Sequence, residues 1–384
     1  MKFIKFIIIF VAILTLSSCN SSHPDKEGVE VIDLYKDTTI KYARRFLIDH
    51  GKGFKVIHIL ANRETSDTSA TFILYDSVRP QLHYKNSHFI KTPCTRIIAL
   101  SSIYANMIAE VGGLKSIIAI ENVDYYNNSG ITKAVEAGRI FQVQRNPEID
   151  KEAVLKLKPD VIFAFGMGGS SGDFDAKIVE SGIPAVISLD HLERSPLARA
   201  EWIKFFAAFV NRSNEANIIF TEVEKDYDEL KALARNYTDR PNVLTELKFG
   251  DTWYVPGGKS YMAQLINDAN GNYFWSNDTA SGSLPLSFEA VFKKAQKADL
   301  WLNVSMCTTK QQVIAQDKRY ADFEAYKKNS IYNNNLYCNK LKYSTYWETG
   351  MIYPNRILSD MIQMFHKQAK DSLDRPFYYY KQVN

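Results

Sequence analysis

The sequence predicts an α/β protein of two lobes, with sheets rich in parallel strands and a long helical connector between the lobes. Short apolar runs alternate with stretches of helical spacing, and this alternation is typical of parallel sheets. The stretch from Ser195 to Asn236 keeps helical spacing with few helix breakers. A faint repeat links the two halves, because Glu152-Ala153-Val154 and Glu289-Ala290-Val291 each lead through an aspartate into an apolar run.

The first strand–helix–strand unit begins at Ile97. The apolar run Ile97–Leu100 predicts a buried strand, and the helical spacing from Ile103 to Val111 predicts the helix that follows it. Ligands of open α/β sheets gather at the carboxyl ends of strands. Ser101, Ser102 and Tyr104 are therefore candidate ligand-binding residues. The alternative is that the two serines only cap the helix, since serine is a favourable N-cap residue.

The remaining elements follow from the same patterns. Residues 39–92 form a small β section, with strands expected at 55–60 and 70–75, and residues 93–194 form the N-terminal lobe. In that lobe a short helix follows Asp150, and the strand 161–165 leads into a glycine-rich loop that holds Met167. Residues 195–240 are the connector and residues 241–384 the C-terminal lobe. Its expected elements are a strand at 242–248, an aromatic loop at 251–260, helices at 261–267, 286–297 and 354–366, a strand at 300–304 and a hairpin around 333–335.

The amino-terminal stretch has the features of an export signal. Lys2 and Lys5 precede an apolar segment from Phe6 to Leu16, which is shorter than a membrane-spanning helix. Leu16-Ser17-Ser18-Cys19 resembles a bacterial lipobox, which implies that residues 1–18 are a signal peptide and that Cys19 carries lipid. Residues 19–38 are then the anchor and a flexible tether. We expect a periplasmic location in the cell envelope, anchored to a membrane by lipid alone; the alternative is an ordinary cysteine after a secretory signal.

Charge and cysteine content restrict the partners further. The net charge of +4 and the lack of a basic cluster interleaved with aromatics argue against nucleic acid. Three cysteines remain besides Cys19, without metal-type spacing. Export permits a disulfide, and Cys307 with Cys338 is the favoured pair, which leaves Cys94 free.

Four stretches carry a family resemblance that covers about residues 92 to 366. They are R-I-I-A-L-S-S-I-Y from Arg96, E-A-V-L-K-L-K-P-D-V-I from Glu152, the helical stretch from Ser195, and T-W-Y-V-P-G-G-K-S-Y-M from Thr252 together with Y-W-E-T-G from Tyr346. The chain thereby resembles the periplasmic substrate-binding lipoproteins of ABC importers for ferric siderophores, haem and cobalamin. Ser102 departs from the pattern, because proline is common at its position.

The resemblance implies a function and two further site residues. It implies a ligand held between the lobes, and a protein that captures a bulky metal chelate and delivers it to an ABC permease in the inner membrane. It also implies that Glu152 and Glu289 dock on arginines of the permease, although a glutamate in the first turn of a helix is also favourable without a partner. We expect a monomer with no cofactor of its own and no enzymatic activity.

The residue types narrow the ligand without identifying it. Only His191 and His366 are available after Thr92, so a bare divalent metal ion is not expected. His366 lies in the last expected helix, where we expect a surface residue. A planar or chelated ligand requires aromatic walls. Trp253, Tyr254, Trp275 and Trp347 are the candidates in the second lobe, with Tyr104 and Met167 facing them from the first, whereas Trp202 and Trp301 are expected in the core. A corrinoid, haem and a ferric siderophore all stay open.

Two other functional classes compete with a binding protein. An exported hydrolase needs a nucleophile elbow, G-x-S-x-G, followed by an acid and a histidine. We expect no such elbow and therefore no hydrolase. Gly257-Gly258-Lys259-Ser260 is similar to the end of a phosphate-binding loop, but Thr252 stands where that loop needs its first glycine. The third class is a tethered lipoprotein that binds a partner and no small ligand, and an absorption spectrum of the native protein would distinguish it from a chelate binder.

Overall fold

The structure is a computed structural model that describes residues 33–62, 67–145, 148–166, 180–369 and 373–384. The predicted signal peptide, Cys19, Met167 and most of the predicted tether lie outside the described residues. The chain from Leu34 to Asn384 forms one compact unit. No helix in the described ranges is both long enough and apolar enough to cross a membrane.

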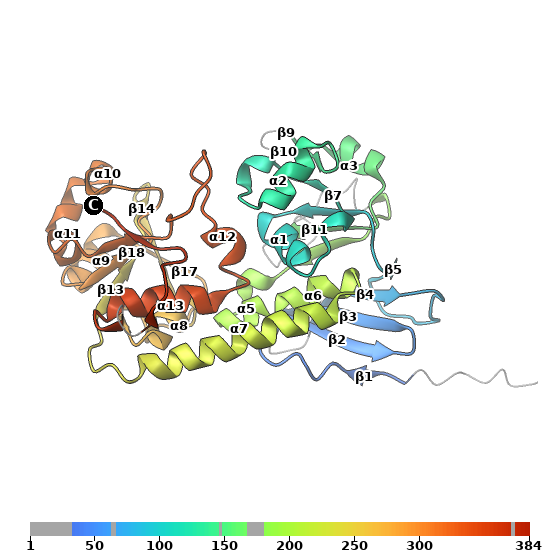
Figure 1. Ribbon diagram of the computed structural model, residues 1–384, viewed down its shortest axis with the longest axis horizontal. Coiled ribbons are helices and arrows are strands. Elements are labelled where there is room, and N and C mark those ends of the chain that lie inside the picture. Colours follow the sequence, from blue (N-terminus) through green and yellow to red (C-terminus); the bar gives the residue numbers. More distant parts are fainter. Residues whose placement is uncertain (1–32, 63–66, 146–147, 167–179, 370–372) are drawn as a thin grey trace, which may run out of the picture. The chain divides into compact units, whose positions relative to one another are not determined.

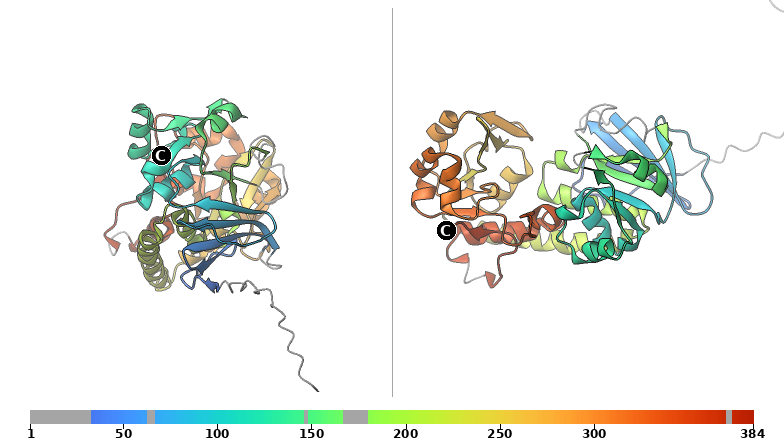
Figure 2. Two further views of the ribbon diagram at one scale, coloured as in Figure 1. Left: turned by 90° about the vertical axis from the view of Figure 1, so that its right-hand side faces the viewer. Right: turned by 90° about the horizontal axis from the view of Figure 1, so that it is seen from above.

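The N-terminal β section is a five-stranded sheet, drawn in blue in Figures 1 and 2. Its strands follow in chain order and pair antiparallel, except for the last two, which are parallel. One face carries the apolar residues of alternate positions, such as Phe46, Ile48 and Phe72. The strands are β1 (Tyr35–Lys36), β2 (Phe46–Gly51), β3 (Phe54–Asn62), β4 (Asp67–Tyr75) and β5 (Ser87–Lys91).

The N-terminal lobe is built on a parallel sheet of order β12-β11-β6-β7-β8. The predicted strands at 97–100 and 161–165 are confirmed, and so is the helix after Asp150; the second strand of the first strand–helix–strand unit is at 117–120. The strands are β6 (Ile97–Leu100), β7 (Ile117–Ile120), β8 (Phe141–Gln142), β11 (Val161–Phe165) and β12 (Ala185–Ser188); the helices are α1 (Ser102–Glu110), α2 (Ser129–Glu136) and α3 (Lys151–Leu157). A two-stranded ribbon, β9 (Gln144–Arg145) with β10 (Glu148–Ile149), precedes α3.

A buried helix joins the two sheets of this half of the chain. The predicted connector is three helices, α5 (Pro196–Ala200), α6 (Trp202–Phe209) and α7 (Ser213–Ala234), and every residue of α6 is buried. The ring centroid of Phe205 lies 5.4 Å from that of Phe46 in the first sheet, and the ring centroid of Phe206 lies 5.0 Å from that of Phe163 in the parallel sheet. Because seven of its eight residues are apolar, α6 is stabilised by packing between these two sheets.

Two buried glutamates attach the N-terminal section to this core. Glu201 accepts the backbone N–H groups of Lys41, Tyr42 and Ala43 at 2.7–2.9 Å. Glu193 accepts those of Arg44 and Arg45 at 2.8 and 2.9 Å. Five consecutive backbone N–H groups before β2 thus donate to the side chains of two glutamates. These hydrogen bonds make the N-terminal section part of the folded unit.

The long helix α7 contacts both the N-terminal β section and the C-terminal lobe, as Figure 1 shows. Near its start, Ser213 Oγ accepts a hydrogen bond from Lys55 Nζ at 3.1 Å, and near its end Tyr227 donates to Asp268 at 2.8 Å. Its 22 residues span about 33 Å at the usual helical rise. The predicted class, two α/β lobes joined by a long helix, is confirmed.

The C-terminal lobe has a second, mostly parallel sheet of order β16-β13-β18-β19-β20 and a small antiparallel sheet of order β14-β15-β17. The strands are β13 (Asn242–Thr245), β14 (Lys248–Phe249), β15 (Thr252–Pro256), β16 (Asn272–Tyr273), β17 (Ser283–Leu286), β18 (Leu300–Leu302), β19 (Ile331–Asn333) and β20 (Lys381–Gln382). The helices are α8 (Tyr261–Asp268), α9 (Phe288–Ala295), α10 (Lys310–Gln316), α11 (Glu324–Lys327), α12 (Tyr346–Thr349) and α13 (Pro354–Phe365).

Three predictions for this lobe are wrong. The expected aromatic loop 251–260 contains strand β15, because Trp253 and Val255 point inward with strand alternation. The expected hairpin around 333–335 does not form, since β19 pairs with β18 and with the distant β20. His366, read from the sequence as a surface residue, is buried, with its ring stacked on Tyr237 and its Nε2 2.9 Å from the Ala269 carbonyl oxygen.

Candidate ligand-binding site

A pocket of about 560 Å³ lies at the carboxyl edge of the C-terminal parallel sheet. Glu246 follows β13, Asn303 follows β18 and Asn334 follows β19, and these three strands are neighbours that run parallel. Open α/β sheets bind ligands at this edge. The volume is in the range of small-molecule sites.

The backbone around this pocket adopts an uncommon conformation. Four residues that line it have a positive φ although none is glycine: Glu246 (64°), Asn303 (61°), Ser305 (53°) and Lys342 (66°). They are four of the ten such residues in the described part of the chain. The left-handed region costs roughly 1–2 kcal/mol for an L-residue, and such strain concentrates at functional sites.

Hydrogen bonds hold this conformation in place. Glu246 N donates to the Leu302 carbonyl oxygen at 2.9 Å, and the Trp301 indole donates to the Glu246 carbonyl oxygen at 2.7 Å. Asn303 Nδ2 donates to Glu246 Oε1 at 3.2 Å, while Asn303 Oδ1 accepts from the hydroxyl of Tyr380 at 2.8 Å. The pocket floor is therefore held in place by hydrogen bonds between protein groups.

Asparagine amides hold the loop that forms one wall. Asn333 Nδ2 donates to the carbonyl oxygens of Ser305 and Cys307 at 2.8 and 2.9 Å, and Asn335 Nδ2 donates to Cys307 O at 3.2 Å. This wall also carries apolar surface, from Met306, Leu336, Tyr343 and Trp347. A half-exposed tryptophan beside polar groups is a suitable contact for a bulky ligand.

Charged groups of both signs line the pocket. Burial raises the pKa of the Glu246 carboxyl to about 7, and the hydrogen bond from Asn303 opposes this rise. Lys342 and Lys381 line the same pocket. No group of three or more histidine, cysteine or acidic side chains in the described ranges is arranged to hold a metal ion.

The structure places the predicted residues of the N-terminal lobe in two environments. Ser101 is the N-cap of α1 and accepts a hydrogen bond from Ile103 N at 3.3 Å, and Ser102 is half-buried at the first position of the helix. Tyr104, however, is 1% exposed, with its ring 5.1 Å from Phe206 and its hydroxyl 3.2 Å from Asp190. Its expected place in a ligand pocket is wrong, because it points into the core of the lobe.

The four aromatic candidates of the C-terminal lobe are also divided, two in the core and two exposed. Trp253 is fully buried and Trp275 is 7% exposed, so both belong to the core and not to a ligand surface. Tyr254 is exposed on β15 but does not line the pocket, and its role stays a prediction. Trp347 is 48% exposed and lines the pocket. Trp202 and Trp301 are buried, as predicted.

Sequence reasoning missed the polar residues of the pocket floor. Glu246 and Asn303 were expected inside strands, at 242–248 and 300–304, whereas β13 and β18 end immediately before them. A polar residue directly after an apolar run was the available signal. Phe165, at the carboxyl end of β11, was also missed: it is exposed, and its ring lies 4.4 Å from that of His191.

Two buried glutamates lie where the lobes contact each other. Glu121, after β7, accepts a hydrogen bond from the hydroxyl of Tyr126 at 2.7 Å, and Glu348 of α12 accepts one from Asn127 N at 2.5 Å. Asn127 Nδ2 also donates to the Tyr343 carbonyl oxygen at 3.0 Å. Burial raises the pKa of both carboxyls to about 7, and their mutual repulsion adds to the rise for Glu121.

This burial predicts a pH-dependent stability. The pKa of Glu121 is about 7 in the folded protein and about 4.5 in the unfolded chain, so the stability it contributes is full below pH 4.5 and is lost as the pH rises to 7. Glu121→Gln removes the ionisation. Between pH 5 and pH 8, we expect the free energy of unfolding of this variant to rise relative to that of the parent protein by on the order of 2 kcal/mol. Its thermal midpoint should rise with it. Glu152→Gln, at an exposed position, is the control; a Glu121→Gln difference that stays constant with pH contradicts the interpretation.

The two predicted docking glutamates occupy equivalent positions. Glu152 is the second residue of α3, capped by Asp150, and Glu289 is the second residue of α9, capped by Ser287. Both are exposed, and each helix precedes a central strand of its sheet, β11 or β18. Arg319 lies 3.0 Å from Glu289, and the backbone of the helix start together with this arginine lowers the pKa of Glu289.

The predicted disulfide is wrong. Cys94, Cys307 and Cys338 are all free thiols. Cys338 Sγ lies 3.5 Å from the Asn335 carbonyl oxygen, whereas Cys307 is buried under the asparagine side chains of the pocket wall. Burial raises the pKa of both thiols, which disfavours their reactive thiolate form.

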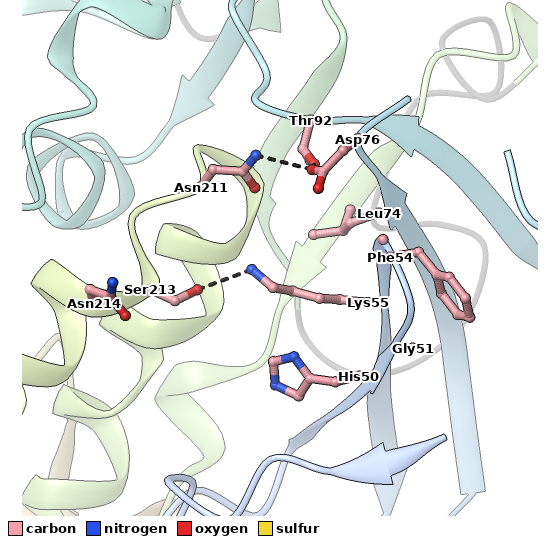
Figure 3. A pocket seen from close by; sticks show the side chains of 11 residues that line it. His50, Gly51, Phe54, Lys55, Leu74, Asp76, Thr92, Asn211, Ser213 and Asn214 are labelled. Carbon is pink, nitrogen blue, oxygen red and sulfur yellow. Dashed lines mark hydrogen bonds between the residues drawn. The ribbon is translucent and has the colours of Figure 1, made fainter. Parts of the chain in front are cut away.

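A smaller cavity of about 300 Å³ lies where the N-terminal sheet meets the start of α7 (Figure 3). Its polar groups pair with one another: Lys55 Nζ donates to Ser213 Oγ, and Asn211 Nδ2 and Thr92 Oγ1 both donate to Asp76 Oδ1 at 3.2 Å. Because these side chains satisfy one another, the larger pocket in the C-terminal lobe is the better ligand site.

Two α/β lobes on one long helix, with a ligand-sized pocket at a sheet edge, define the class of two-lobed solute-binding proteins. The chain belongs to the periplasmic binding protein family, whose sequence profile matches residues 97–334, more than half of the chain. The match begins at β6, so the five-stranded N-terminal sheet lies outside it.

Individual proteins resemble this chain in sequence or in fold. A chain of Methanocaldococcus jannaschii described as an uncharacterized lipoprotein is 29% identical over 297 residues, which cover 74% of this chain and 68% of that protein. A periplasmic haem-binding protein of Pseudomonas aeruginosa has the same fold, with a TM-score of 0.57 at 14% identity over 76% of this chain and 98% of its own. A periplasmic vitamin B12 binding protein of Vibrio cholerae matches with a TM-score of 0.52 at 15% identity, over 72% and 98%.

Proposed function

We propose that the protein is the substrate-binding lipoprotein of an ABC importer, that it captures a bulky metal chelate, and that it delivers the chelate to the permease in the inner membrane. The observation that carries this proposal is the pocket of about 560 Å³ at the ends of β13, β18 and β19, with strained backbone at four of its lining residues. The haem and vitamin B12 specificities of the two structural neighbours support a chelate of similar size.

Trp347 provides the first test of the proposal. Trp347→Ala removes the exposed ring from the pocket wall, and we expect at least tenfold weaker binding of the chelate, because aromatic contacts dominate such sites. Calorimetric titration with cyanocobinamide, ferrichrome and haemin measures the loss. Tyr35→Ala, which removes an exposed ring from β1, is the control and should bind as the parent does. Equal affinity in both variants would remove Trp347 from the site.

Membrane attachment is tested through Cys19. We propose that Cys19 carries the lipid, because its lipobox follows a basic start and an apolar segment. Cys19→Ala should move the protein from the membrane fraction to the soluble fraction, with ligand affinity unchanged, because the position lies before the folded unit. A variant that stays in the membrane fraction after signal cleavage would exclude the lipid anchor.

A hydrolase is the competing proposal, and one expectation against it is wrong. Gly168–Gly172 does have the G-x-S-x-G spacing, although it lies outside the described residues. Among the described residues, Asp190 accepts hydrogen bonds from Tyr104, Ser188 and Arg199, and His366 bonds to Ala269 O in the other lobe. The family match over residues 97–334, by contrast, is to binding proteins. The binding protein is therefore the better-supported function.

A further inference from the structure

We propose that this pocket recognises its chelate through uncharged N–H donors on the rim of the ligand, of the carboxamide kind. The inference rests on the proposed function and specifies its ligand. Two hydrogen-bond acceptors in the pocket lining carry it, the buried Asn335 Oδ1 and the carboxyl of the half-buried Glu246.

Asn335 supplies the first acceptor. The residue is 8% exposed, lines the pocket, and its Oδ1 is buried with no hydrogen-bond partner. Its orientation is determined, because Nδ2 donates to the Cys307 carbonyl oxygen at 3.2 Å and the flipped amide would place two oxygens against each other. A buried acceptor without a donor is unfavourable, so a ligand that brings an N–H gains affinity there.

Glu246 supplies the second acceptor. Its Oε1 accepts a hydrogen bond from Asn303 Nδ2, and Asn303 is held in this donor role because Tyr380 donates to its Oδ1. The described residues give the other carboxyl oxygen no hydrogen bond. The left-handed backbone of Glu246 turns the side chain into the pocket lining instead of continuing the strand.

The spacing of these acceptors suits a large ligand. Glu246 follows β13 and Asn335 lies two residues beyond β19, with β18 between the two strands. Neighbouring strands are 4.7–4.9 Å apart, so the two positions are separated by roughly 10 Å across the sheet. One small amide cannot contact both acceptors, whereas a macrocycle with several amide groups on its rim can.

The charge of the lining selects neutral donors over ammonium groups. Lys342 and Lys381 line the same pocket and oppose an ammonium group on the rim of a ligand. Their ammonium groups are donors only, which suits the carbonyl half of a carboxamide. A chelate with only carboxylates on its rim, such as haem, presents hydrogen-bond acceptors and no donors. Asn335 Oδ1 and the Glu246 carboxyl are acceptors too, so neither would receive a hydrogen bond from it.

The test compares four chelates on the purified protein. Cyanocobinamide carries primary carboxamides, the corresponding corrinoid acid carries carboxylates at those positions, ferrichrome is an uncharged iron chelate with peptide amides, and haemin carries carboxylates. We expect cyanocobinamide or ferrichrome to bind at least tenfold more tightly than the corrinoid acid and haemin. The preference between the first two identifies whether the amides belong to a cobalt or an iron chelate.

Two variants connect that preference to the acceptors. Glu246→Gln keeps the shape and the bond from Asn303 but presents an N–H to the ligand, and Asn335→Leu removes the acceptor. Each should reduce affinity for the amide-bearing chelate about tenfold, or 1.4 kcal/mol, and reduce the preference over the acid form. If Asn335→Leu fails to fold, Glu246→Gln still tests the proposal through the same two affinity measurements. Glu222→Gln, on the exposed side of α7, is the control and should change neither value.

The outcomes separate the two proposals. If a carboxylate-rimmed chelate binds as tightly as the amide-bearing ones, or if Glu246→Gln leaves the preference unchanged, the inference is overturned while the chelate-binding function stands. If none of the four chelates binds, the proposed function fails, and the inference that rests on it fails with it.

Discussion

Replacing Trp253 by alanine is expected to destabilise the C-terminal lobe severely and to leave the ligand site intact in the molecules that fold. The side chain is fully buried among the rings of Trp301, Tyr320, Phe323 and Phe288. The centroids of these rings lie 5.5–6.1 Å from that of Trp253, and those that contact one another are 5.0–6.5 Å apart. Its indole donates to the Thr245 carbonyl oxygen at 3.1 Å. A cavity of this size costs about 3–5 kcal/mol in free energy of unfolding.

Urea denaturation measures this loss. Trp253→Phe should cost less, because it keeps part of the ring packing and loses only the larger ring and its hydrogen bond. Phe249→Ala is the matched control: it removes an exposed aromatic ring from the neighbouring strand β14 and should change stability by less than about 0.5 kcal/mol. A Trp253→Ala protein that is as stable as the parent but binds the chelate more weakly would contradict this prediction and show that Trp253 contacts the ligand.

The second large effect concerns the two exposed glutamates that begin α3 and α9. We propose that Glu152 and Glu289 contact arginines of the permease, so Glu152→Ala combined with Glu289→Ala should abolish uptake in cells while chelate affinity is unchanged. Charge pairs at the rim of an interface mainly set the encounter rate and the register of the partners. Lysine at both positions should be worse, because like charges would then meet.

The structure shows why folding should tolerate this change. When Glu289 is removed, Arg319 keeps Asp317, which accepts its Nε at 3.0 Å and its Nη2 at 2.7 Å. The free energy of unfolding should therefore change by less than about 1 kcal/mol. Glu222→Ala with Glu229→Ala, which removes two exposed carboxylates from α7, is the matched control and should not affect uptake. Normal uptake by the Glu152/Glu289 variant would exclude the docking role.

The two glutamates also illustrate what a repeat can reveal. The shared E-A-V pattern predicted related lobes, and both glutamates occupy the second position of a capped helix that precedes a central strand. Capping residues and helix starts are local features, so a sequence shows them directly. What partner the exposed carboxylates meet is not local, and only the uptake experiment addresses it.

The aromatic residues show the limit of such reasoning. The sequence predicted Trp253 and Trp347 equally as ligand-binding residues, because both lie in polar stretches close to glycine. In the structure the first is in a strand that turns it toward the core, while the second is exposed on the wall of the pocket. A strand alternates its side chains between two faces, so one residue of register decides burial, and composition does not report register.

The sequence by itself determined the α/β class, the long helix, most strands and helices, and the positions of the two helix-start glutamates. These follow from periodicity, caps and breakers within short windows of the chain. Only the tertiary structure decided the pocket, the buried state of Trp253 and His366, and the pairing of β19 with β20. The pocket is lined by left-handed backbone at Glu246, Asn303, Ser305 and Lys342. Hydrogen bonds from residues distant in the sequence hold two of these positions, since Leu302 and Trp301 bond to the backbone of Glu246 and Tyr380 bonds to the side chain of Asn303.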